Sequence, residues 1–204
     1  MLAGVSHDLK TPLTRMKLAL AMMHDDADIR ALKSDIAEME HMLDDYLAFA
    51  RGEGGEEAEE TDLGELVRDT ATAAAKARAA EDERLTVAAP EHVMLSVKRA
   101  ALRRCLTNLV DNALKAGRHV AVTLTKGERH AEIAVEDDGP GIPESRREEA
   151  FRPFHRLDQG RNLQAGGSGL GLAIARDIAR AHGGDITLDK SRLGGLKAVI
   201  RLPV

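Results

Sequence analysis

The sequence is poor in aromatic residues and in cysteine. Only 2% of its 204 residues are aromatic, with three Phe, one Tyr and no Trp, so the hydrophobic core must be built from aliphatic side chains. The single cysteine, Cys105, excludes an intrachain disulfide and is typical of a reducing compartment. Because Cys105 falls at core spacing with Leu102 and Leu109, we expect a buried thiol rather than a reactive one.

Long apolar runs and a surplus of basic charge are absent as well. The sequence has no run of 18 apolar residues and no signal peptide, so we expect no membrane contact from this stretch. Its formal net charge is -5, which argues against a general nucleic-acid binder because no excess of Lys and Arg is available to displace counterions. The sequence starts within an expected helix, which we interpret as the mark of a fragment of a longer protein.

Residues 1–51 carry the pattern of two amphipathic helices joined by a polar connector at 24–28. The first helix has an apolar residue every three or four positions, and the second keeps a heptad pattern for three repeats. The second stripe consists of Ile29, Leu32, Ile36, Met39, Leu43, Tyr46 and Ala50. Two helices alone cannot bury this much apolar surface, which favours a four-helix bundle made by two chains. The alternative is a monomeric hairpin packed on the rest of the chain.

Residues 52–60 (GEGGEEAEE) indicate an acidic, glycine-rich linker that serves as a solvated spacer, and residues 61–204 a second domain. In that domain we expect helices over 62–80, 98–116 and 169–181, and strands over 85–88, 93–97, 120–125, 131–136, 185–188 and 196–202. This order predicts an α+β fold, an α/β sandwich in which helices cover one face of a mixed sheet.

The first helix also presents a histidine to solvent. His7 lies between Val5 and Leu9 of the apolar stripe, so its imidazole is expected to point outward beside Asp8. An exposed imidazole next to a carboxylate has the parts of an oriented nucleophile, with a ring nitrogen to attack and an acid to take its proton. The alternative is an incidental surface histidine, and this segment alone does not decide between the two.

A pair of asparagines is the first of three clusters in the second domain. Asn108 and Asn112 lie four residues apart on one face of a helix, with Lys115 nearby. Two amides and a lysine converging on one surface could hold Mg²⁺ and phosphate oxygens. Alone, paired asparagines are a weak signal.

The other two clusters are rich in glycine. Asp137-Asp138-Gly139-Pro140-Gly141 follows a strand, and its acid could accept a hydrogen bond from an exocyclic amine such as that of adenine, although a simple turn is the alternative. Gly167-Ser168-Gly169-Leu170-Gly171 opens a helix whose free amides suit an anion. The order and separation of the three clusters make a strong joint signal.

Together with the His7 segment, these clusters resemble the cytoplasmic core of the two-component sensor histidine kinases, most closely the osmosensing EnvZ type. In chain order the matching motifs are those around His7, Asn108–Asn112, Asp137-x-Gly139-x-Gly141, Phe151-x-x-Phe154 and Gly167-x-Gly169-x-Gly171. Residues 3–15 and 194–204 also look like EnvZ, so the resemblance covers essentially the whole chain.

The resemblance implies a role for each matching residue. His7 would be the phospho-acceptor, Asp8 its general base, and Thr11 would support dephosphorylation of a partner regulator. The nucleotide-binding residues would be Asn108, Asn112, Lys115, Asp137, Gly139, Gly141, Phe154, Gly167, Gly169, Leu170 and Gly171. Of these, Asn112 and Asn108 would bind Mg²⁺, and Asp137 would contact the adenine amine. Residues 155–168 would form a mobile ATP lid with Phe151 and Phe154 at its hinge.

The implied activity is ATP-dependent autophosphorylation of His7, transfer to an aspartate of an OmpR-like response regulator, and phosphatase activity toward that regulator. ATP and Mg²⁺ would be the cofactors. The chain would form a homodimer through residues 1–51, and the regulator would dock on the first helix around Arg15, Met16, Ala19 and Met22. This portion would be cytoplasmic, in a full-length protein of the bacterial inner membrane.

Two other functions stay open. The first is an ATPase that resembles DNA gyrase and its relatives and hydrolyses ATP. Those enzymes place a glutamate four residues before the metal-binding asparagine, as the base that activates water. This sequence has Asn108 there, so water should be a poor phosphoryl acceptor. EnvZ-like sequences commonly place an aromatic after the basic residue, whereas this one has Ala116 after Lys115. That departure leaves a scaffold with a degenerate nucleotide site as the non-enzymatic alternative.

Overall fold

The computed structural model describes residues 2–24, 26, 28–30, 32, 33, 36, 39, 43, 56–77, 84–155 and 169–204, with side chains in the first helix from residue 11 onward. In chain order its elements are α1 (Leu2–Ala21), β1 (Glu59–Asp62), α3 (Leu63–Ala77), β2 (Leu85–Ala88), β3 (Met94–Val97), α4 (Arg99–Ala116), β4 (Val120–Lys126), β5 (His130–Asp137), the short 3-10 turns η2 (Glu144–Arg146) and η3 (Glu149–Phe151), α5 (Gly171–Ala181), β6 (Asp185–Lys190) and β7 (Leu196–Pro203). Within these ranges no helix is long and apolar enough to cross a membrane.

The predicted helical hairpin is confirmed by its buried apolar side chains. Leu13 and Leu20 of α1 pack with Ile29 and Ile36 of the second helix, and Leu43 is partly buried against them. The second helix is capped at its start, because the Ile29 N–H donates to the Asp26 carboxylate at 2.8 Å. The last two members of the predicted stripe, at positions 46 and 50, lie outside the described residues. The pairing of two hairpins in a bundle stays a prediction.

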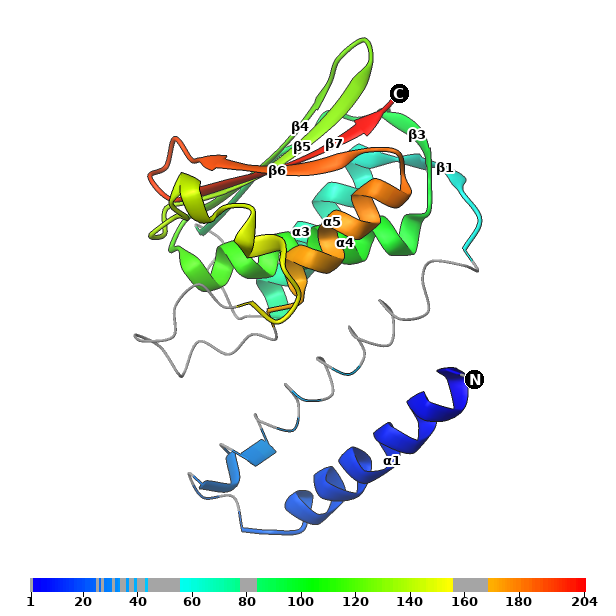
Figure 1. Ribbon diagram of the computed structural model, residues 1–204, viewed down its shortest axis with the longest axis vertical. Coiled ribbons are helices and arrows are strands. Elements are labelled where there is room, and N and C mark those ends of the chain that lie inside the picture. Colours follow the sequence, from blue (N-terminus) through cyan, green and yellow to red (C-terminus); the bar gives the residue numbers. More distant parts are fainter. Residues whose placement is uncertain are drawn as a thin grey trace.

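A mixed sheet forms one layer of the second domain, as predicted, and it has five strands, because the sixth predicted strand, β3, pairs with β1 instead. Its strand order is β2-β4-β5-β7-β6, with β2 parallel to β4 and every other pair antiparallel. Helices α3, α4 and α5 cover one face of this sheet (Figure 1). The register sets Val120 opposite Asp137, so the start of β4 and the end of β5 lie at the same end of the sheet. The loops that follow α4 and β5 therefore meet at this end.

Aliphatic side chains between the sheet and the helices form the core. Leu102, Leu106 and Leu109 of α4 are at most 2% exposed, because α4 packs against both α3 and α5. Cys105 is fully buried as predicted, and its thiol donates to the Ala175 carbonyl at 3.4 Å. Since α4 lies between two helices, little of its surface faces solvent. Asn108 is therefore only 7% exposed.

The acidic stretch expected to be a solvated spacer makes specific contacts from Glu56 onward. Glu59 and Glu60 belong to strand β1 and pair with Val97 and Ser96 of β3. The Glu56 carboxylate accepts the N–H groups of Ala100 and Ala101, at 2.6 and 3.1 Å. The first amides of a helix lack acceptors within it, and negative charge is favourable there. Glu56 therefore caps α4, whose N-cap residue supplies no side-chain cap.

Candidate functional site

The two asparagines of α4 lie against the first residue of α5. A Cβ placed on Gly171 would be 3.4 Å from Asn112 Nδ2 and 3.8 Å from the Asn108 Cβ and Cγ, which is ordinary van der Waals contact, so α5 begins directly beside the two asparagines. Asn112 is half-buried, and Lys115 is exposed one turn further along. The fold thus brings together two clusters that are some 60 residues apart in sequence.

Asn108 holds an unsatisfied polar atom at this contact. Its side-chain Nδ2 is buried and has no hydrogen-bond partner within the described part of the chain. A buried amide left without a partner costs about 1–3 kcal/mol. A bound group that offers an oxygen acceptor would remove this cost.

The backbone just before α5 is hydrogen-bonded to a residue that precedes the expected ATP lid. Gly169 has a φ of +67°, which favours glycine, and its carbonyl accepts the Phe154 N–H at 3.1 Å. Phe154 is itself left-handed, with a φ of +62°, and its side chain is 66% exposed. At the N-cap, Leu170 provides no side-chain cap, and free amides in a first helical turn favour an anion. Gly167 and positions 156–168 of the expected lid lie outside the described residues.

Asp137, at the end of β5, is a buried carboxylate with an ordered orientation. It is 3% exposed, and its Oδ1 accepts the N–H groups of Gly139 at 2.8 Å and Leu196 at 3.2 Å. Burial raises the pKa of Asp137 above its usual value, although the bonds from these two amides oppose the rise. Both donors reach Oδ1 and neither reaches Oδ2. A carboxylate held in this way can offer its second oxygen to a ligand.

The loop after β5 approaches neighbouring backbone too closely for side chains. A Cβ on Gly139 would lie 2.6 Å from the Ala116 carbonyl oxygen, so this glycine permits contact with the end of α4. Gly141 has a φ of +67°, and a Cβ there would lie 3.1 Å from the Gly195 carbonyl oxygen. The two glycines of the predicted motif are therefore required by close approach.

The neighbouring carboxylate, Asp138, holds the same loop to the segment after α4. It accepts the backbone N–H groups of His119 and Arg118 at 2.9 and 2.6 Å, and it contacts His119 Nδ1 at 2.7 Å. Hydrogen bonds from the His119 backbone and side chain lower the pKa of Asp138 to about 2. Asp137 and Asp138 thus have separate tasks, since only Asp137 is buried in the site.

Arg176 of α5 connects the two segments that flank the expected lid. Its guanidinium lies 4.2 Å from the centroid of the Phe151 ring and donates to Glu148 and to Asp185, each at 2.9 Å. Burial raises the pKa of Asp185, but hydrogen bonds from Arg176 and Arg180 outweigh it and lower the value to about 2. Sequence reasoning missed this cluster because an isolated arginine on an amphipathic helix gives no signal.

We expect Asp185→Asn to lower the free energy of unfolding at neutral pH by about 1 kcal/mol, a modest amount because Asp185 is 42% exposed. The native pKa is depressed, so the stabilisation is complete above the ordinary value of 3.8 and is lost as the pH falls through about 2. Denaturant unfolding at pH 7 and pH 2 measures this, with Asp189→Asn as control. Equal losses at both pH values would contradict it.

The expected phospho-acceptor lies on α1. The backbone at His7 and Asp8 is helical, and their side chains lie outside the described residues. Thr11 is exposed and follows His7 by four residues, so the two share one face of the helix.

Two family models match the chain. Residues 1–55 match the His Kinase A (phospho-acceptor) domain, and residues 97–204 match the histidine kinase-, DNA gyrase B-, and HSP90-like ATPase family. The first match contains His7. The second contains Asn108, Asn112, Asp137 and Gly171.

Similar proteins cover the whole chain. Sensor histidine kinase GtrS of Pseudomonas aeruginosa is 36% identical over 204 residues, which are 100% of this chain and 41% of GtrS. The chain therefore spans less than half the length of that relative. Among solved structures, full-length ShkA in complex with AMPPNP has a TM-score of 0.76 at 25% identity, covering 99% of this chain and 45% of ShkA. The ATP binding domain of PrrB from Mycobacterium tuberculosis has a TM-score of 0.59 at 30% identity, covering 72% of this chain and 96% of that domain. By its sequence matches and its fold, the chain belongs to the two-component sensor histidine kinases, as its resemblance to the EnvZ type implied.

Proposed function

We propose that the protein is an ATP-dependent histidine kinase that phosphorylates His7, passes the phosphoryl group to an aspartate of an OmpR-like response regulator, and dephosphorylates that regulator. The observation that carries the proposal is the contact of Gly171 with Asn108 and Asn112. It supports a single site in which amide side chains and a helix N-terminus face the same phosphates.

The residues present fit ATP and Mg²⁺. Asn112 and Asn108 would hold the metal through side-chain oxygens, which are ligands that Mg²⁺ accepts, and Lys115 would contact phosphate. The buried Asn108 amide nitrogen, which lacks a partner, would find an acceptor in a phosphate oxygen. Amides at Gly169–Gly171 would bind phosphate, and Asp137 would accept the adenine amine. When bound, Mg²⁺ offsets the negative charge of the phosphates.

The transfer step is assigned to His7 and Asp8. An imidazole nitrogen of His7 forms a bond to the γ-phosphorus while the bond from that phosphorus to the ADP oxygen breaks, and ADP leaves with the electron pair. Asp8 orients the ring and takes its proton. In the dephosphorylation of the regulator, Thr11 positions a water beside the phosphoaspartate. Asn108, where hydrolytic relatives carry a glutamate, disfavours direct attack of water on ATP.

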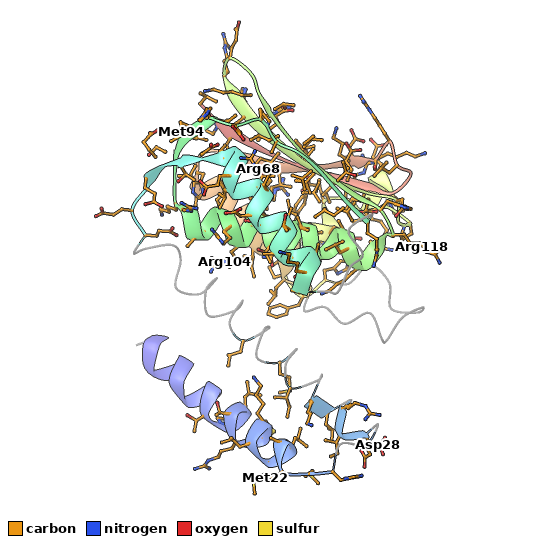
Figure 2. The ribbon with its side chains drawn as sticks, turned by 180° about the vertical axis from the view of Figure 1, so that it is seen from behind. Met22, Asp28, Arg68, Met94, Arg104 and Arg118 are labelled. Atoms are coloured by element: carbon orange, nitrogen blue, oxygen red, sulfur yellow. The ribbon has the colours of Figure 1, made fainter. Side chains whose placement is uncertain are left out.

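The hairpin has the surface that a dimer and a regulator need. Met23, Leu32 and Met39 are apolar and between 46% and 54% exposed in the single chain. A second hairpin would cover such side chains in a four-helix bundle. Met22, at the end of α1, is 90% exposed (Figure 2) and belongs to the surface where the regulator would dock, with Arg15, Met16 and Ala19. We place this portion in the cytoplasm and the full-length protein in the bacterial inner membrane.

Incubation with γ-labelled ATP and Mg²⁺ tests the proposal. The protein should acquire label that acid releases and alkali preserves, as expected for phosphohistidine, and EDTA should abolish labelling because the phosphates then lose their counter-ion. Added OmpR-like regulator should remove the label from the kinase and acquire it. Steady release of phosphate without labelled protein would support an ATPase instead, and no binding of ATP near millimolar would support a scaffold.

A further inference from the structure

The loop between β6 and β7, residues 191–195, lies directly against the end of β5. The Gly195 N–H donates to the Asp137 carbonyl at 3.1 Å, and the next amide, that of Leu196, donates to the Asp137 carboxylate. A Cβ on Gly195 would lie 2.2 Å from Asp137 Oδ1. The loop backbone therefore forms one wall around the carboxylate, and any movement of the loop would turn or release it.

Glu136, which precedes Asp137, fixes the other end of this loop. Its Oε2 accepts the Ser191 hydroxyl at 3.0 Å and the Arg192 N–H at 3.1 Å, while Lys197 lies 3.5 Å from Oε1. Burial raises the pKa of Glu136, but these donors outweigh it and hold the pKa below its usual value. Glu136 is thus a negative charge that the loop surrounds.

Ser191 is the connection between Glu136 and the loop backbone. It is 4% exposed, and its hydroxyl both donates to Glu136 and accepts the Leu193 N–H at 2.9 Å. Its own N–H donates to the Gly195 carbonyl at 2.9 Å, which closes the loop immediately before the amide that binds Asp137. A continuous chain of hydrogen bonds thus runs from Glu136 through Ser191 to Gly195.

We infer that Ser191 and Glu136 are positioning residues for nucleobase selection, because they seat the loop that directs the Leu196 amide onto Asp137 Oδ1 and leaves Oδ2 for an exocyclic amine. This inference rests on the proposed function, in which Asp137 contacts adenine. The terminal torsion of an aspartate is broad when unconstrained. Two amides on one oxygen fix it, so the second oxygen is oriented before the base arrives.

The test compares ATP with purine riboside triphosphate, which differs from ATP by lacking the amine. Dissociation constants for both are measured in Mg²⁺ with the whole chain, as native protein and as Ser191→Ala and Glu136→Ala. The native protein should prefer ATP by roughly tenfold or more, the worth of one hydrogen bond to a charged group. Both variants should lose most of this preference, chiefly through weaker binding of ATP.

Glu132→Ala is the matched control. Glu132 lies on the same strand four residues earlier and is likewise opposite a basic residue of β7, since Arg201 donates to it at 2.8 Å. This variant should keep the full preference for ATP. Because both nucleotides are measured on one sample, the ratio of their dissociation constants does not depend on how much of a variant is folded.

The possible outcomes distinguish failure of the proposed role of Asp137 from failure of the inference about the loop. If the native protein binds both nucleotides equally, Asp137 does not select the amine and that part of the proposed function fails. If the native protein prefers ATP, and the Ser191→Ala and Glu136→Ala variants keep this preference, the proposed role of Asp137 in selecting the amine is supported. The inference about the loop is then overturned. Loss of the preference in Glu132→Ala as well would also overturn it, because the effect would then be general to the strand.

Discussion

Replacing His7 with glutamine is expected to reduce the uptake of acid-labile phosphate from labelled ATP to background. Glutamine keeps a polar side chain on the same helix but has no nucleophilic nitrogen, so no bond to phosphorus can form. The dissociation constant for ATP should not change, because the residues proposed to bind it lie between residues 108 and 171, on α4, on β5 and the segments that follow it, and at the start of α5. Acid-quenched labelling and equilibrium nucleotide binding measure the two effects separately.

His24→Gln is the matched control for this experiment. His24 follows the end of α1 and is exposed, so its replacement alters another histidine of the same segment. It should label like the native protein. Clear labelling of the His7→Gln protein would refute the assignment of the phospho-acceptor, whereas loss of label in both variants would point to damage to the hairpin.

Asp137→Asn should weaken ATP binding by about 100-fold at neutral pH. The change removes a charged acceptor, worth about 1.5–3 kcal/mol, and an amide group in its place sets N–H donors against the adenine amine and the amides of Gly139 and Leu196. Titration calorimetry or competition with a fluorescent nucleotide measures this loss. Asp138→Asn alters the adjacent carboxylate, which bonds to the segment after α4, and should keep most of the affinity.

The raised pKa of Asp137 adds a pH dependence to this prediction. Burial favours the protonated acid, so the native protein should lose ATP affinity as the pH falls through a value above the usual 3.8 for aspartate. The Asp137→Asn protein has no carboxylate to protonate at this position and should show a flatter profile over the same range. Identical profiles for the two proteins would assign the pH dependence to another group.

Local sequence pattern was sufficient to predict most of the helices and strands. Alternation placed strand β4 at residues 120–125, one residue short of its end, and apolar spacing placed α4 within one residue of its start. The three clusters were visible because their glycines and polar residues are unusual for a strand or helix. The burial of Asn108 was not predicted, because it depends on α5, whose contact with α4 is not encoded in the spacing of α4 itself.

Contacts between distant segments account for what sequence did not show. Arg176 binds Glu148 and Asp185, which belong to other elements, and Ser191 binds Glu136 from 55 residues away. Each of these residues is of a type that is common at its position in a helix, strand or loop, so the local sequence pattern does not single it out. Only the register of β5 with β7 brings Lys197, Ser191 and Glu136 together.

Glu56 attaches the acidic stretch to the start of α4, and in the proposed function this contact limits how far the ATP site can lie from its phospho-acceptor. Counted from residue 51, the predicted end of the hairpin, the first residue held to this domain is five positions along when Glu56 is bound, and eight positions along, at Glu59 of β1, when it is not. Five residues span at most about 18 Å and eight residues at most about 28 Å. The shorter span would reduce the accessible volume about fourfold and raise the local concentration of the ATP site near the hairpin accordingly. In the proposed function, Glu56 would therefore help to set the largest separation between the phosphoryl donor and His7.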